Sequence, residues 1–312
     1  MSEAALELRR QVPVALLRPA ELSRLIGAAL ADWGVIVGCW IAMALAPAWL
    51  LPVGVIVVAG RLHALGVVLH DACHMQGRPS GARARVLELL AGYPITTTLA
   101  AMRYHHLRHH RHNGSALDPY FKAGASHRFW PATLARLRGL VVPPAWIARA
   151  YVGCLALRWP RLRNGYGRIF LGERSGDDLR EHREILDCLR AEPGQALFFL
   201  ALVPIAVVFP AAFLVGYALP LLLAGLCNAN RVVAEHEHIA GIDHSEAGIV
   251  ATTRTHGGGF LTRLVMFPRH IGLHTMHHLH PRASMDSLPA LQRWYEARWS
   301  ERAAATNADS SA

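Results

Sequence analysis

Two long apolar blocks constrain this chain more than any other feature. Residues 33–69 and 196–227 are almost continuously apolar and contain 37 and 32 residues. A helix that crosses a membrane needs roughly 20 residues, so each block is long enough for two crossings. Two prolines stand in the middle of each block, where we expect a tight turn. The sequence therefore predicts an all-α integral membrane protein with four transmembrane helices in two hairpins.

Two weaker apolar stretches lie between these blocks, at residues 86–102 and 140–157. The first contains Glu88 and Pro94, and the second contains Arg149 and two adjacent prolines. We expect both stretches to lie at the membrane interface or to be re-entrant. The alternative is that they provide a fifth or a sixth crossing.

The composition supports a membrane protein. Only 17% of the residues are charged, against about 25% in an average soluble protein. The net charge of +10 is carried almost wholly by arginine, with Lys122 as the one lysine. A basic chain can bind nucleic acid, but no nucleic-acid motif is present, so we expect contact with membrane lipids instead. The five cysteines are scattered without a CxxC pair, which disfavours a disulfide framework or a cysteine zinc site.

The distribution of positive charge predicts the topology. Lysine and arginine number 4 before residue 31, 20 from 61 to 195 and 8 from 231 onward, and the two expected hairpin tips have none. The positive-inside rule then places both termini and all polar regions in the cytoplasm. The expected organisation is a cytosolic segment at 1–30, a membrane domain at 31–300 with a cytosolic cap formed by 70–195 and 228–300, and a disordered tail at 301–312.

The 19 histidines are the second constraint, because most of them cluster in the regions predicted to be cytoplasmic. The clusters read HDACH at 70–74, HHLRHHRH at 105–112 and HTMHH at 274–278, and His236 stands in AEHEH. On a helix, positions i, i+3 and i+4 share one face, so each cluster can aim two or three imidazoles at one point. Lone histidines are expected to be structural or at the surface: His63, His127, His182, His244 and His256.

The number of clustered imidazoles predicts two metal ions. A single tetrahedral zinc takes four ligands, whereas eight clustered histidines and His236 supply four or five ligands to each of two ions. Imidazole suits iron, zinc, copper and nickel, so the ligand type alone does not name the metal. One register stays open, because His105 has the same i, i+4 relation to His109 that His106 has to His110.

These motifs resemble the three histidine boxes of the membrane fatty acid desaturase family. Asn113 and Asp118-Pro119 after the second box, and HLHP at 278–281 followed by Leu288-Pro289, resemble that family too, and the resemblance covers about residues 30–295. It implies a mushroom-like fold in which four spanning helices carry a cytosolic helical cap that holds two iron ions. By motif position, it implies nine iron ligands: His70, His74, His106, His109, His110, His236, His274, His277 and His278.

The chain departs from the family pattern near the third box. His270 stands where many relatives have asparagine, and Met276 stands where many have glutamate or glutamine. Other polar residues are candidates for supporting the ligands. Asp71 is expected to orient a ligand imidazole through its other ring nitrogen. His270, His105, Asp118 and Glu235 are further candidates, with salt bridges to arginines as an equal alternative for the two carboxylates.

A polyhistidine di-iron site at a membrane face suits the activation of O2 to attack an unactivated C–H bond. Such a bond offers no acidic proton, so the metal must carry the chemistry while the protein positions the chain. The resemblance implies an O2-dependent oxidoreductase that introduces a double bond into a fatty acyl chain of a lipid. The alternative is a hydroxylase or ketolase of a lipid, alkane or carotenoid with the same site. In either case we expect an apolar tunnel between the spans for a long acyl or isoprenoid chain.

Each of these reactions needs two external electrons. No flavin or nucleotide fingerprint is present, so we expect a separate donor: a ferredoxin, a rubredoxin or a cytochrome with its reductase. The arginine-rich face suits an acidic carrier, although the positive-inside rule explains the same charge.

Two other classes of function are disfavoured. A metal transporter needs ligands along a path inside the spans, and the apolar blocks contain only His63. An intramembrane zinc protease needs glutamate directly after the first histidine of HExxH, where this chain has Asp71.

Overall fold

The structure is a computed structural model that describes residues 4–122, 124–125, 128–238 and 245–309. Every regular element in these ranges is a helix, so the all-α prediction is confirmed. The longer helices are α2 (Leu22–Leu45), α3 (Leu51–Cys73), α5 (Leu99–His112), α6 (Phe129–Arg158), α8 (Arg183–Val208), α10 (Leu219–Glu235) and α14 (Leu288–Asp309). The shorter helices are α1 (Ala4–Gln11), α4 (Gly81–Leu87), α7 (Arg163–Phe170), α9 (Pro210–Phe213), α11 (Glu246–Thr252), α12 (Phe260–Val265) and α13 (His274–Leu279).

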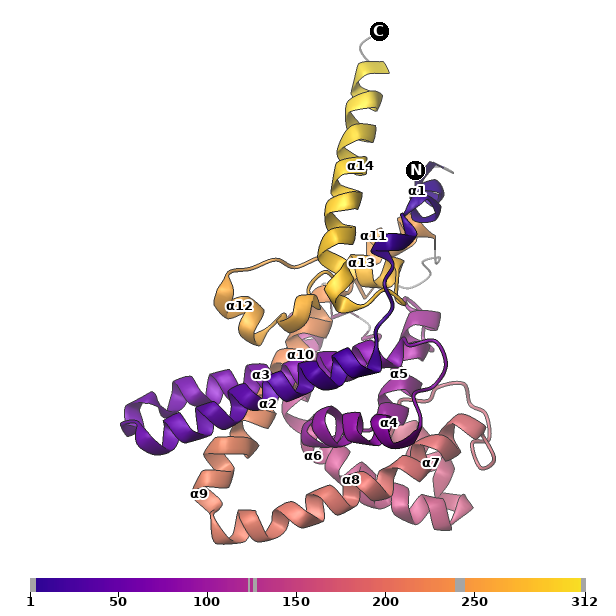
Figure 1. The fold of residues 1–312 in the computed structure, drawn as a ribbon. Coiled ribbons are helices and arrows are strands. Elements are labelled where there is room, and N and C mark those ends of the chain that lie inside the picture. Colours follow the sequence, from indigo (N-terminus) through magenta and orange to yellow (C-terminus); the bar gives the residue numbers. More distant parts are fainter. Residues whose placement is uncertain (1–3, 123, 126–127, 239–244, 310–312) are drawn as a thin grey trace.

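Each apolar block forms a helical hairpin, as the sequence predicts. Helices α2 and α3 are joined by a turn that follows Pro47, and α8 reverses into α9 and α10 at Pro210. Figure 1 shows the two hairpins extending away from the end of the molecule where both termini lie. The helices begin before the apolar blocks or continue beyond them, since α8 starts at Arg183 and α10 ends at Glu235. These extensions carry polar side chains beyond the apolar blocks.

Helix α6 is a fifth helix long and apolar enough to cross a membrane. It contains the stretch at 140–157 that the sequence predicts as interfacial or re-entrant, and it runs unbroken through Pro143 and Pro144. It packs against α10 and α8. A Cβ atom at Gly139 or Gly225 would collide with the backbone of the other helix, so small residues allow α6 and α10 to approach closely.

Both flanks of α6 adjoin α5. Before α6, the hydroxyl of Tyr120 lies 2.8 Å from Nδ1 of His105. After α6, the carboxylate of Glu173 accepts hydrogen bonds from Tyr104 and from Nε of Arg108, the latter at 2.9 Å. The segments before and after α6 therefore both lie beside α5.

Segments from the two ends of the chain pack together. Leu8 and Val12 pack with Met276, Leu279 and other buried residues of α13 and α14 in one apolar cluster. Arg18 accepts a backbone hydrogen bond from Ser284 at 2.8 Å. These contacts hold the two terminal regions together at one end of the molecule, as Figure 1 shows.

Helix α14 differs from the expectation for the tail. Residues 301–309, part of the segment predicted to be disordered, continue the helix. Alanine has the highest helix propensity, and three consecutive alanines at 303–305 favour this continuation. Residues 310–312 lie outside the described ranges.

Candidate metal centre

Four helices bring the histidine clusters to one place. His70 lies in the last turn of α3, and His74 is the residue that ends this helix. The second cluster lies on α5, whose first turn is capped by the hydroxyl of Thr98, which accepts from the amide of Ala101 at 3.1 Å. The third cluster forms α13, and His236 directly follows α10. The predicted helical spacing is therefore realised in α3, α5 and α13.

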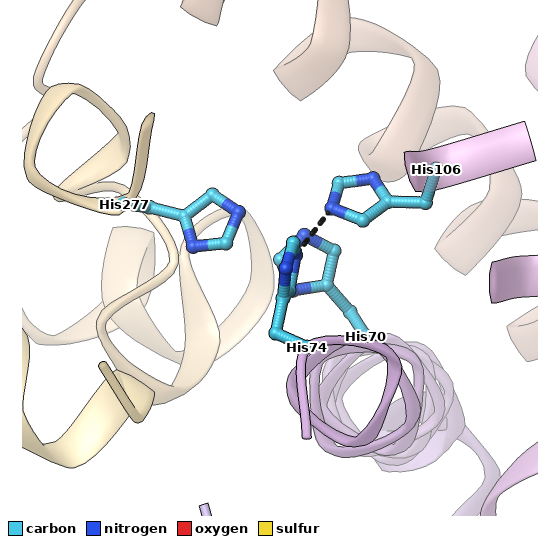
Figure 2. A group of neighbouring side chains, drawn as sticks. All are labelled: His70, His74, His106 and His277. Atoms are coloured by element: carbon cyan, nitrogen blue, oxygen red, sulfur yellow. Dashed lines mark hydrogen bonds between the residues drawn. The ribbon is translucent and has the colours of Figure 1, made fainter. Parts of the chain in front are cut away.

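The first group consists of His70, His74, His106 and His277. One ring nitrogen from each lies within 4.8 Å of the others, and all four residues are buried. Figure 2 shows His70 and His74 projecting from α3 toward His106 of α5, with His277 facing them from the opposite side. The Nε2 atoms of His74 and His106 are 2.8 Å apart.

The second group consists of His109, His236, His274 and His278. Their ligand atoms also lie within 4.8 Å of one another, and all four residues are buried. The Nε2 atoms of His236 and His274 are 2.8 Å apart, and those of His109 and His278 are 3.3 Å apart.

His110 lies against both groups. Its Nε2 atom is 3.0 Å from Nε2 of His106 and 2.9 Å from Nε2 of His277, both in the first group. Its ring stacks on His278 of the second group, with centroids 4.3 Å apart. All nine histidines of the predicted set thus converge, and we call them the histidine centre.

The protonation of these rings fits a metal site. Burial, with repulsion from neighbouring histidines, holds the pKa of His106, His110 and His277 well below the usual value. Burial and the charge of Arg103 lower the pKa of His74 to about 3. A neutral imidazole has a free lone pair, which metal binding requires. Two groups of four imidazoles fit two transition-metal ions, and the donor type is one that iron accepts.

Two carboxylates lie against rings of the second group. Both oxygens of Asp118 lie 3.0 Å from Nδ1 of His109, so Nδ1 donates and Nε2 is left as the lone-pair nitrogen. An oxygen of Glu235 lies 3.4 Å from Nδ1 of His274. Glu235 in turn accepts a hydrogen bond of 2.5 Å from Arg231, one helical turn earlier on α10. The structure thus brings both predicted carboxylates to the histidine centre.

The other three residues predicted to support the ligands are Asp71, His105 and His270, and they belong to neither histidine group. Asp71 accepts from the backbone amide of Met285 at 3.2 Å, which ties α3 to the segment after α13 rather than to an imidazole. His105 points toward Tyr120 and belongs to neither group. His270 is exposed and also belongs to neither group, because it adopts a left-handed backbone conformation with φ of 64° before α13 begins. The structure therefore favours His106 over His105 in the second box. His127 and His244 lie outside the described residues.

Two residues near the centre were not expected from the sequence. The ring of Tyr120 stacks on His109, with centroids 4.6 Å apart, and Arg231 holds Glu235. Tyr120 could have been identified from the sequence because it lies two residues after Asp118, a predicted supporting residue. The signal for Arg231 is its i, i+4 spacing to Glu235, which favours an ion pair on a helix.

An apolar cavity of about 220 Å³ opens beside the histidine centre. It lies between α3, α5, α6 and α10 and reaches His70, His106, His109, His236 and His274. Its walls away from the histidines are mostly aliphatic, with Leu62, Val142 and Leu221 among them, while Lys122 and Arg138 add positive charge. The expected apolar space between the spans is therefore present. A hydrocarbon chain in it would lie against the imidazoles.

Comparison with known proteins agrees with this arrangement. A protein-family model described as fatty acid desaturase matches residues 46–309, most of the chain. This match confirms the resemblance predicted from the histidine boxes. A search of curated proteins found no match.

Proposed function

The chain belongs to the fatty acid desaturase family, and on that premise we propose that it is an O2-dependent membrane di-iron oxidoreductase that introduces a double bond into a fatty acyl chain. The position of the histidines beside the apolar cavity supports this proposal most directly. Two groups of four buried histidines lie side by side, and five histidines of the centre line an apolar cavity. Family membership supports a lipid oxidoreductase, and the site supports a reaction on hydrocarbon.

The nine histidines of the centre are the residues that would hold two iron ions, with four-residue groups on each side and His110 between them. Bound iron supplies the redox chemistry that activates O2 and removes hydrogen from carbon. The protein's own residues orient and protect the site. Asp118 keeps the proton of His109 on Nδ1, Glu235 lies against His274, and the aliphatic walls of the cavity exclude water from the chain being oxidised.

The overall reaction requires an electron donor. One O2 takes up two hydrogens from adjacent carbons, two external electrons and two protons, and the products are one double bond and two waters. We propose a separate ferredoxin, rubredoxin or cytochrome with its reductase as the source of the electrons.

We also propose that the protein is multi-pass, with both termini and the histidine centre on the cytoplasmic side. Long apolar helices and family membership make it a membrane protein. The arginine-free hairpin tips and the arginine-rich cap support this orientation.

Lipid analysis tests the proposed function. The gene is expressed in a host that has its own electron carriers, and total lipids are compared by mass spectrometry with a host that lacks the gene. We expect new unsaturated acyl chains, and we expect His277→Ala to abolish them and to lower the iron content, because His277 contacts both the first group and His110. Oxygenated products in place of alkenes would assign a hydroxylase or ketolase, and full product yield from His277→Ala would reject the centre as the active site.

A further inference from the structure

The histidine centre is reached by a second space that is separate from the apolar cavity. A recess of about 250 Å³ is lined in part by His74 and His110, the two histidines of the centre that reach it. Neither of these histidines lines the apolar cavity, and none of the five that line the cavity lines the recess. The histidine centre is therefore reached by the apolar cavity and also by a recess with a different set of lining residues.

The recess is basic. Arg103 and Arg282 line it, and no acidic residue does. Arg111 directly follows His110 on α5 and is exposed. None of the three arginines forms an ion pair with the part of the chain that the structure describes, whereas nearby Arg78 is paired with Asp187 at 2.6 Å. We call the recess with its two lining arginines, together with Arg111 beside its lining residue His110, the basic recess.

His110 gives the recess a direct connection to both histidine groups. It is the one half-buried member of the nine, and the other eight are buried. Its Nε2 atom is within 3.0 Å of ring nitrogens of the first group, and its ring stacks on His278 of the second. An electron delivered in this recess therefore has a short path to each of the two metal positions.

We propose that the basic recess is the docking site of an acidic one-electron carrier protein and that electrons reach the histidine centre through His110 and His74. This inference rests on the proposed function, because only a redox reaction needs such a carrier. Unpaired arginines around the recess would attract an acidic surface and steer its approach. The substrate, which is apolar, enters from the other side, so lipid and carrier bind at the same time without competing.

Charge reversal at the rim tests this proposal. The wild-type holoenzyme and the double variant Arg111→Glu/Arg282→Glu are compared in turnover driven by an acidic plant-type ferredoxin with its reductase and by an acidic rubredoxin. We expect the double variant to lose about tenfold or more of the carrier-driven rate at low ionic strength. We also expect the wild-type rate to fall as salt is raised, because salt screens exposed charges.

Two controls separate docking from folding and from chemistry. Arg293→Glu makes one such charge reversal at an exposed position of α14 that has no ion pair with the described residues, and we expect it to keep the carrier-driven rate. In the second control, each enzyme is reduced by dithionite and then exposed to O2, and we expect the double variant to match the wild type in single-turnover product and in iron content.

The results of these experiments distinguish a failure of the docking proposal from a failure of the proposed function. The docking proposal is overturned if the double variant keeps the full carrier-driven rate. It is also overturned if Arg293→Glu loses as much rate, or if neither acidic carrier supports turnover that dithionite supports. Absence of product with every reductant, in the wild type as well, would instead contradict the proposed function.

Discussion

At the scale of single residues, the centre shows how neighbours on one helix take different roles. His105 and His106 are adjacent in the sequence, and both are buried. His106 lies in the first histidine group, whereas Nδ1 of His105 faces the hydroxyl of Tyr120. Adjacent positions on a helix point about 100° apart, so only one of the two rings can face His74.

This pair provides a matched test of the site. We expect His106→Ala to reduce the metal bound per protein by about half, because one group loses a ligand. We expect His105→Ala to keep its metal, since only a hydrogen bond to Tyr120 is lost. Metal analysis of the two purified variants measures the difference. Equal losses in both would show that the second box does not have the register seen here.

The sequence predicts the structure best where local helical spacing determines the geometry. The two hairpins follow from apolar length, and the convergence of the three clusters follows from i, i+3 and i+4 spacing. The choice of His106 over His105 and the assignment of His236 as a ligand came from the family resemblance. His270 did not follow the same rule, because the chain leaves helical geometry there, with positive φ at Arg269 and His270. Contacts between distant segments, such as Asp71 with Met285, leave no periodic signal. They could therefore not be predicted from one sequence.

At the scale of elements, a buried ion-pair network joins the first hairpin to the segment before α13. Oδ1 of Asp32 in α2 accepts from Arg61 of α3 at 3.1 Å, and Oδ2 accepts from Arg269 at 2.8 Å. Arg61 also donates to the carbonyl of Leu264 at 2.9 Å, and Arg269 to the carbonyl of Ala28 at 2.7 Å. Left-handed backbone at a residue other than glycine is costly, and this network holds Arg269 in that conformation. Asp32 therefore ties α2 to the segment that precedes the third histidine cluster.

Removal of this carboxylate should weaken both the fold and the third cluster. We expect Asp32→Ala to lower the free energy of unfolding by roughly 3 kcal/mol, because two partly buried arginines lose their partner. We also expect it to release metal at a lower temperature. Glu21→Ala is the control, since Glu21 pairs only with exposed Arg24, and we expect a change below about 1 kcal/mol. Thermal unfolding and metal analysis of the two purified variants measure these changes. If Glu21→Ala destabilises the protein and releases metal as much as Asp32→Ala does, Asp32 has no special role in the third cluster.

At the scale of the whole molecule, the position of α6 decides how many helices cross the membrane. Residues on both flanks of α6 contact α5, and the two terminal regions of the chain pack together through Arg18 and Ser284. Terminal regions on one side require an even number of crossings. We therefore propose that α2, α3, α8 and the α9–α10 segment cross, while α6 lies across the inner part of the second hairpin.

Topology reporters test this arrangement. Green fluorescent protein, which fluoresces only on the cytoplasmic side, is fused after residue 126 and, in a second protein, after residue 177, one fusion on each side of α6. We expect fluorescence from both fusions, and alkaline phosphatase at the same points should be inactive. Opposite signals from the two positions would mean that α6 crosses the membrane.

The sharing of the histidine centre among α3, α5, α10 and α13 has a consequence for biosynthesis. During translation the first box emerges long before the third, so the two four-residue groups are complete only when residues 277 and 278 have been made. A nascent chain can hold His70 and His74 beside the bilayer, but it cannot yet enclose a metal ion in the final set. For the proposed di-iron enzyme we therefore expect metal loading to be a late event in maturation, after both hairpins have been made.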